Sequence, residues 1–290
     1  AASPRMQAFL ATRQNDLLTL PESVALSTAL DAALESAETV IISIGSQSLR
    51  SLLGQSELQA LRSRTVVLCM KGLEMGTGAR LSQIAAELLH PSNTVAVWLG
   101  PGHVQEFYRG IPNCMVIDSE REDVKRRLVQ AFSSDLIRFY YGGDMIGNEV
   151  GAAAKNVVGI AAGFLDGVEM SSLKGALMSR GTREVARLIR AMGGNELSAY
   201  GLCHLGDYEA TVFSPYSHNR QFGEAFIRHQ DFHRLAEGYY TVEALMLLGR
   251  QYGVELPICR AVHDILYEHA DPPAALQSLL RRGLRAEFED

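Results

Sequence analysis

The sequence predicts an α/β domain followed by an all-helical domain. Over the first half of the chain, short apolar runs rich in β-branched residues alternate with helical or loop segments. This alternation is typical of a parallel sheet covered on its faces by other elements. After Gly143 the strand pattern stops, and nearly everything onward has a helical pattern interrupted by Gly and Pro. We therefore expect two domains, at residues 1–142 and 143–290.

The α/β domain is expected to contain five strands. TVIISIG (39–45), in which most residues are β-branched, is the first clear strand signal along the chain. The other expected strands lie at 65–72, 94–100, 114–119 and 136–143, and helices are expected at about 78–89 and 121–132.

Composition and charge exclude several classes of protein. A chain of 290 residues can form two domains that each bury a core. The net charge of −6 argues against a general nucleic-acid binder, which is usually basic. No apolar run approaches the roughly 20 residues that a membrane-spanning helix needs. The four cysteines are scattered without a CxxC motif, which indicates free thiols and a cytoplasmic location.

The segment Glu149–Gly167, EVGAAAKNVVGIAAGFLDG, organises the rest of the chain. It is expected to form one helix, with very small residues on both sides of Lys155. Small side chains let another helix or a ligand approach closely. A lysine on such a crowded apolar surface is desolvated, which lowers its pKa and suits it to proton transfer. A lone lysine on a buried helix more often snorkels to solvent, so the neighbouring motifs decide between the two interpretations.

Several long segments, in a fixed order, resemble the NAD(P)-dependent glycerol-3-phosphate dehydrogenases. Besides residues 149–167 they are VVLCMKGLE (66–74), LGPG (99–102), GLCHLGDYEATVFSPYSHNRQFG (201–223), LAEGYYTVEAL (235–245) and GVELPIC (253–259). The resemblance implies a Rossmann-like dinucleotide-binding domain followed by a helical substrate-binding and dimerisation domain. It also implies NAD or NADP as cofactor, interconversion of sn-glycerol 3-phosphate and dihydroxyacetone phosphate for phospholipid biosynthesis, and a homodimer.

The resemblance also assigns roles to residues. Lys155 matches the general acid/base, and Asp207 matches the carboxylate that positions it. The substrate-binding positions are Lys71, Gly100, Asn156, Asp207, Thr211, Ser217, His218 and Asn219. The cofactor-binding positions are Lys71, Val104, His218, Leu235 and Glu237. Lys71 also follows an expected strand directly, and the carboxyl ends of parallel strands line the ligand crevice in such sheets.

The glycine loop of a dinucleotide-binding domain is missing from this sequence. No GxGxxG motif follows a strand, and GLEMGTG (72–78) has the wrong spacing, so we expect it to be an ordinary loop. NDLLTLP (15–21) resembles the family's segment after its second strand. We therefore expect the Rossmann-like domain to be N-terminally incomplete and to lack its first βαβ segment. The residues that distinguish NAD from NADP then lie upstream of Ala1.

Three further positions depart from the family pattern. GPGHV (100–104) has Gly102 where the family has a hydroxyl residue, and Gly45 replaces a usual proline. In SHNR (217–220), His218 replaces the arginine that clamps phosphate, and histidine is shorter and largely neutral at pH 7. These changes predict weaker phosphate binding or another substrate. They leave two alternatives open, a dehydrogenase for a different hydroxy compound and a non-catalytic scaffold.

We expect no metal site. His229 and His233 are spaced i,i+4, which could place two ligands on one helix face. A zinc site needs at least one more protein ligand, and the neighbouring sequence offers none. A solvated helix end is the expected setting of the two histidines.

Overall fold

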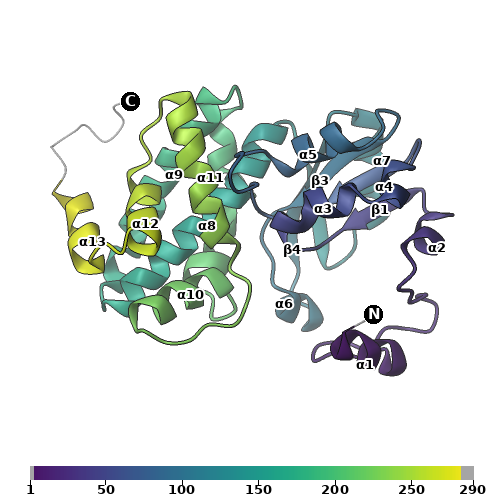
Figure 1. Ribbon diagram of the computed structural model, residues 1–290, viewed down its shortest axis with the longest axis horizontal. Coiled ribbons are helices and arrows are strands. Elements are labelled where there is room, and N and C mark those ends of the chain that lie inside the picture. The colour runs from purple at the N-terminus through teal and green to yellow at the C-terminus, as the bar shows by residue number, and fades with distance from the viewer. Residues whose placement is uncertain (1–2, 282–290) are drawn as a thin grey trace.

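The computed structural model describes residues 3–281 and divides into two lobes, an α/β lobe and a helical lobe (Figure 1). The described part of the α/β lobe contains a five-stranded sheet in the order β1-β2-β3-β4-β5. Its strands are β1 (Thr39–Ile42), β2 (Thr65–Leu68), β3 (Thr94–Leu99), β4 (Asn113–Ser119) and β5 (Ile137–Tyr141). All five predicted strands are present, each shorter than or close to its predicted length.

One strand pair differs from the predicted parallel sheet. β1, β2 and β3 are parallel to one another, and β4 is parallel to β5, but β4 runs antiparallel to β3. The link between β3 and β4 holds only the short helix α6 (Val104–Tyr108), which buries none of its residues. This link therefore does not cross a face of the sheet as a βαβ connection does. The β-branched runs predict strands but carry no information on their direction.

Helices cover both faces of the central strands. On one face, α3 (Leu49–Leu53) and α5 (Leu81–Leu88) pack against alternate side chains of β2 and β3. On the other face, α7 (Glu122–Phe132) packs against the intervening ones. Every residue of β2 is buried, as expected for a strand covered on both sides. The remaining elements of this lobe are α1 (Pro4–Thr12), α2 (Leu30–Leu34), η1 (Ser46–Ser48) and α4 (Ser56–Gln59).

The helical lobe is built around one buried helix, α8 (Met145–Gly167). Its residues from Gly147 to Leu165 are all buried, and α9, α10, α11 and α12 pack around it (Figure 1). The other elements are η2 (Ser171–Leu173), α9 (Lys174–Ala191), η3 (Glu196–Tyr200), η4 (Leu205–Asp207), η5 (Glu209–Phe213), α10 (His218–Ile227), α11 (Glu237–Tyr252), α12 (Pro257–Tyr267) and α13 (Pro272–Leu280).

The glycines of α8 permit backbone contact with α10. A Cβ added at Gly163 would lie 2.1 Å from the carbonyl oxygen of Arg220, and one at Gly223 would lie 2.3 Å from that of Ile160. No side chain fits at these distances, so the two helices cross with their backbones touching. This confirms the steric role predicted for the small residues of this segment.

Buried carboxylates join the start of α8 to the sheet lobe. Glu149 accepts hydrogen bonds from the backbone N–H and the hydroxyl of Ser82, and it pairs with Arg80 at 2.6 Å. Asp118, at the end of β4, accepts from the backbone N–H of Asp144 and from the side-chain amide of Asn148. These bonds fix α8 relative to the strand ends.

No helix within residues 3–281 is long and apolar enough to cross a membrane.

Candidate active site

Lys155 lies at the meeting point of α8, the strand ends and the η4–η5 segment. Only 8% of the residue is exposed. Its Nζ lies 3.0 Å from Oδ2 of Asp207 and donates a hydrogen bond of 2.8 Å to Oγ1 of Thr211. Asp207 and Thr211 are each 1% exposed. The structure thus brings Lys155 together with Asp207 and Thr211, which lie more than fifty residues further along the chain.

Lys71 reaches the same carboxylate from the sheet lobe. Its Nζ lies 2.7 Å from Oδ2 of Asp207 and donates to the carbonyl oxygen of Gly100 at 2.5 Å. The side-chain amide of Asn156 donates to the carbonyl oxygen of Lys71 at 2.8 Å. One carboxylate therefore serves two ammonium groups, one from each lobe. The strand-end position predicted for Lys71 and Gly100 places both beside α8.

Burial lowers the pKa of Lys155 to about 8. The negative charge of Asp207 opposes this shift, and the positive charge of Lys71 adds to it. The lowered pKa that the sequence predicted from desolvation is confirmed. A lysine in this state can exchange a proton near neutral pH, which a solvated lysine does poorly.

A π-helix shapes the segment that holds the partners of Lys155. η5 has i→i+5 bonding, and such turns often occur at functional sites. Thr211 Oγ1 donates to the carbonyl oxygen of Asp207 at 2.7 Å, so its oxygen lone pairs face Lys155. The D-x-x-x-T spacing alone is unremarkable, and the irregular turn was not predictable from it.

A second chain of hydrogen bonds extends from Asn156 toward α11. Asn219 donates to the side-chain carbonyl of Asn156 at 3.1 Å and accepts from the backbone N–H of Gly238 at 2.9 Å. Ser217 does not join this chain. Its hydroxyl accepts from the backbone N–H of Arg220 at 3.3 Å and caps the N-terminus of α10.

Glu237 makes its contacts with a residue that the sequence analysis did not single out. Its Oε1 accepts from the backbone N–H of Ser46 at 2.8 Å, and its Oε2 accepts from the Ser46 hydroxyl. Ser46 follows Gly45, just after β1, so this contact joins the two lobes at a strand end. The position of Ser46 after a strand could have marked it as a site residue. Its partner Glu237 lies 191 positions away, so the contact itself was not predictable from the sequence.

Lys155, Asp207, Thr211 and Lys71 form one group of contacts, the Lys155 cluster. The predicted phosphate-clamp residue His218 lies on the surface and does not contact this cluster. His218 is exposed, and partial burial and the positive charge of Arg234 lower its pKa. Arg234 donates to the side-chain oxygen of Gln221 at 3.3 Å. Arg220 instead turns inward and pairs with Asp166 at 2.8 Å. Arg234 is a residue that the sequence analysis missed, because nothing in its local sequence marks it.

Two of the residues assigned to the cofactor are exposed and apolar. Val104 is 54% exposed and Leu235 is 51% exposed, and both offer apolar surface that a planar ring could cover. A Cβ added at Gly45 would make an ordinary contact of 3.6 Å with Leu235. Among residues 3–281 no GxGxxG loop provides a cradle for the pyrophosphate.

Gly102 accounts for one departure from the family pattern. Its φ of +142° lies in a region that favours glycine, and a Cβ there would lie 2.6 Å from the ring of Phe107. A serine or threonine at this position would require Phe107 to move. The hydroxyl that the family usually offers here is thus replaced by an aromatic ring from α6.

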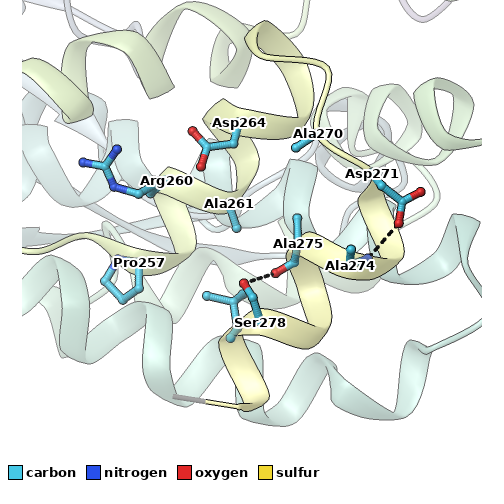
Figure 2. Close-up of a pocket in the computed structure, with 10 residues that line it drawn as sticks. Pro257, Arg260, Ala261, Asp264, Ala270, Asp271, Ala274, Ala275 and Ser278 are labelled. Carbon is cyan, nitrogen blue, oxygen red and sulfur yellow. Dashed lines mark hydrogen bonds between the residues drawn. The ribbon is translucent and has the colours of Figure 1, made fainter. Parts of the chain in front are cut away.

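The groove between α12 and α13 is remote from this chemistry. It has a volume of about 310 Å³, and Arg260 and Asp264 are its charged members on α12 (Figure 2). The polar groups of α13 that line it are used within that helix, where Asp271 accepts from the backbone N–H of Ala274. Neither Lys155 nor Asp207 lines this groove. The candidate active site is therefore identified from the contacts of Lys155 with Asp207 and Thr211 and not from this groove.

His229 and His233 lie outside any helix. α10 ends at Ile227, and both histidines belong to the loop that follows it. The i,i+4 spacing therefore does not place them on one helix face. Both histidines are exposed, and His229 lies two residues beyond the end of α10, as expected for a solvated helix end. The described residues contain no group of three or more His, Cys, Asp or Glu side chains that could hold a metal ion.

The chain is similar to one family over nearly its full length. Residues 6–125 match the family model for the N-terminus of NAD-dependent glycerol-3-phosphate dehydrogenase, and residues 144–277 match the one for its C-terminus. The glycerol-3-phosphate dehydrogenase [NAD(P)+] of Thiobacillus denitrificans is 36% identical over 93% of this chain and 84% of its own length. That of Thermus thermophilus is 38% identical over 89% of this chain and 80% of its own length.

Solved structures agree with this result. The crystal structure of glycerol-3-phosphate dehydrogenase from Coxiella burnetii superposes with a TM-score of 0.89 at 28% identity, covering 96% of this chain and 88% of the other. The fold is therefore a Rossmann-like N-terminal domain followed by a helical C-terminal domain. With the family models and the relatives above, the chain belongs to the NAD-dependent glycerol-3-phosphate dehydrogenase family.

Proposed function

We propose that this chain is an oxidoreductase that interconverts sn-glycerol 3-phosphate and dihydroxyacetone phosphate with NAD or NADP. The observation that carries the proposal is the Lys155 cluster, a buried lysine held between Asp207 and Thr211 beside the strand ends. Relatives that are 36% and 38% identical carry the name of this activity. The family membership supplies the substrate and cofactor class, and the cluster supplies the chemistry.

In this mechanism Lys155 is the general acid/base for the C2 oxygen of the substrate. A bound nicotinamide supplies or accepts the hydride at C2. Lys155 donates a proton to the oxygen when the ketone is reduced and removes it when the alcohol is oxidised. Its pKa of about 8 makes both protonation states available near neutral pH. Asp207 and Thr211 hold the ammonium group in place, since both contact Nζ.

Other residues of the candidate site orient the substrate and the cofactor. Lys71 adds a second positive charge beside Lys155, which favours an anionic substrate. Asn156 and Asn219 provide amide groups for substrate hydroxyls, and Gly100 allows close approach to the end of β3. His218 and Ser217 lie at the phosphate end of this proposal. Lys71, Val104, His218, Leu235 and Glu237 are the residues assigned to the cofactor.

The domain boundary, partners and location are further parts of the proposal. We place the boundary between residues 142 and 143, which the end of β5 at Tyr141 and the start of α8 at Met145 support. We propose a cytoplasmic homodimer. Four cysteines without a disulfide, Cys69, Cys114, Cys203 and Cys259, support a reducing compartment. Light scattering coupled to gel filtration tests the dimer, and a monomer at micromolar concentration would contradict it.

The deciding experiment is the oxidation of NADH and NADPH in the presence of dihydroxyacetone phosphate. We expect turnover that depends on both the ketone and the reduced cofactor. Reactions without ketone serve as controls. Calorimetric titration with NADH, run in parallel, separates a failure of catalysis from a failure of cofactor binding. Absence of both turnover and cofactor binding would sink the proposal and favour a non-catalytic scaffold.

A second candidate is a dehydrogenase for a different hydroxy compound. The observations that favour it are the exposed His218 and the Phe107 ring in the place of a side chain at Gly102. Both changes affect groups expected to hold the substrate. A panel of phosphorylated and non-phosphorylated ketones separates the candidates. A higher kcat/KM for a non-phosphorylated ketone would replace the first candidate by this one.

A further inference from the structure

A buried histidine and a buried tyrosine adjoin the Lys155 cluster and take no part in the chemistry above. His204 and Tyr208 are both 0% exposed. Nδ1 of His204 lies 2.8 Å from the carbonyl oxygen of Gly151, and its Nε2 lies 2.7 Å from the hydroxyl of Tyr208. A carbonyl only accepts, so Nδ1 carries the ring proton and Tyr208 donates to Nε2. Both ring nitrogens of His204 are therefore satisfied.

The hydrogen bonds from Gly151 through His204 to Tyr208 form a bridge between α8 and the η4–η5 segment. Its α8 end lies at the turn that carries Lys155. Gly151 precedes Lys155 by four residues, so its carbonyl also accepts the backbone N–H of Lys155 within the helix. A Cβ at Gly151 would lie 3.0 Å from Cβ of His204. Glycine at this position therefore allows the histidine ring to reach the helix backbone, whereas any larger residue would push it away.

The other end of the bridge lies in the segment that contacts Lys155. Tyr208 directly follows Asp207, and η5, which holds Thr211, begins at the next residue. The rings of His204 and Tyr208 meet edge to face at a centroid distance of 4.8 Å. A bond between His204 and Tyr208 thus restrains Asp207 and Thr211 at once.

The charge state of His204 matters because of its neighbours. Burial lowers the pKa of His204 to about 4, although its bond to Gly151 opposes this, and the positive charge of Lys155 lowers it further. The ring is therefore neutral at pH 7. Lys155 then faces one negative group, Asp207, one positive group, Lys71, and the neutral His204.

We propose that His204 and Tyr208 are positioning residues, which hold Asp207 and Thr211 against Lys155. Without the bridge, Asp207 moves away from Lys155, and the lysine loses its only negative neighbour in the cluster. Loss of that charge favours the neutral amine, so the pKa of Lys155 falls below its value in the intact protein. The effect on turnover rests on the proposed function, whereas the effect on the titration of Lys155 does not.

The test is a pH titration of the protein labelled with ¹³C at lysine Cε. The chain contains only four lysines, Lys71, Lys125, Lys155 and Lys174, so each signal can be assigned by substitution. Tyr208→Phe removes the hydrogen bond between Tyr208 and His204. His204→Asn keeps a donor for the Gly151 carbonyl but removes the acceptor for the Tyr208 hydroxyl. Tyr267→Phe is the matched control, because it loses a hydrogen bond of 2.8 Å to the Tyr239 carbonyl away from the cluster.

We expect the titration midpoint of Lys155 to move downward in Tyr208→Phe and His204→Asn and to stay in place in Tyr267→Phe. The kcat should fall about tenfold in the first two variants. An unchanged or raised midpoint would overturn the inference and leave the pair a purely structural role. If His204→Asn does not fold, Tyr208→Phe alone decides. If the unaltered chain shows no turnover, the proposed function fails while the titration still tests the inference.

Discussion

The two ends of the candidate site differ in how their charged groups are held. At the Lys155 end, Lys155 and Asp207 are buried and Lys71 is partly buried, and their charged or polar partners lie at 2.7–3.0 Å. At the His218 end, the histidine is exposed, and Arg234 donates to the neutral amide of Gln221. Arg220 turns away from this end toward Asp166. Under the proposed function, the difference separates the residues for proton transfer, which are fixed by buried contacts, from those for anion binding, which are not.

This difference has a physical basis in solvent screening. Charges inside the protein interact more strongly than exposed ones, so small changes in position at Lys155 have large effects. Exposed charges are screened by water and salt, and each contributes little alone. We therefore expect substitutions at the Lys155 end to change kcat and those at the His218 end to change KM.

The largest effect is expected for Lys155→Ala. Removal of a general acid/base costs about a thousandfold in kcat, and NADH affinity should stay nearly intact because Lys155 holds the substrate oxygen. Steady-state kinetics and calorimetric NADH binding measure the two quantities. Lys174→Met is a matched control, since Lys174 is buried and pairs with Asp166 at 2.7 Å but lies outside the cluster. An unchanged kcat in Lys155→Ala would refute the acid/base role.

The pH dependence follows from the lowered pKa of Lys155, about 8. Ketone reduction needs the protonated lysine, so its rate is full below the pKa and falls about tenfold per pH unit above it. Alcohol oxidation needs the neutral amine, so its rate rises with pH through the same value. Asp207→Asn removes the charge that raises this pKa. The pH–rate profiles of ketone reduction and alcohol oxidation should therefore both move to lower pH. Rate profiles whose midpoint does not respond to Asp207→Asn would contradict the pairing.

A smaller effect is expected for His218→Arg. An arginine there restores a permanent positive charge and a bidentate donor, so the KM for dihydroxyacetone phosphate should fall about tenfold, with kcat little changed. Arg234→Ala, which removes the nearby charge, should raise this KM. His218→Gln is the neutral control. If neither His218→Arg nor Arg234→Ala alters this KM, the phosphate is held elsewhere and the two ends of the site are less separate than proposed.

The sequence predicted the Lys155 end better than the His218 end, for a physical reason. Small residues around Lys155 predicted a buried helix and a lowered pKa, because burial is a local property of α8. The five strands were predictable from their β-branched runs. The antiparallel direction of β4 was not, because it depends on the path of the chain after Gly100. Contacts such as Ser46 with Glu237 join residues far apart in sequence, and no local pattern reports them.

The smallest effect on catalysis is expected for Arg220→Gln. Arg220 is half of a largely buried ion pair with Asp166 and also pairs with Glu224 at 3.1 Å, so its loss should cost about 2 kcal/mol of stability. The KM for the phosphorylated substrate should stay within about twofold, because the guanidinium is directed into the helical lobe. Thermal unfolding and steady-state kinetics measure the two effects.

Arg228→Gln is the matched control for this change, because Arg228 pairs with the same Glu224 at 3.1 Å but is 45% exposed in its side chain. An exposed pair of this kind contributes about 0.5 kcal/mol or less. A large rise in KM for Arg220→Gln with unchanged stability would mean that Arg220 leaves Asp166 to bind the phosphate. The His218 end would then organise only when substrate arrives, whereas the Lys155 end is already organised without it.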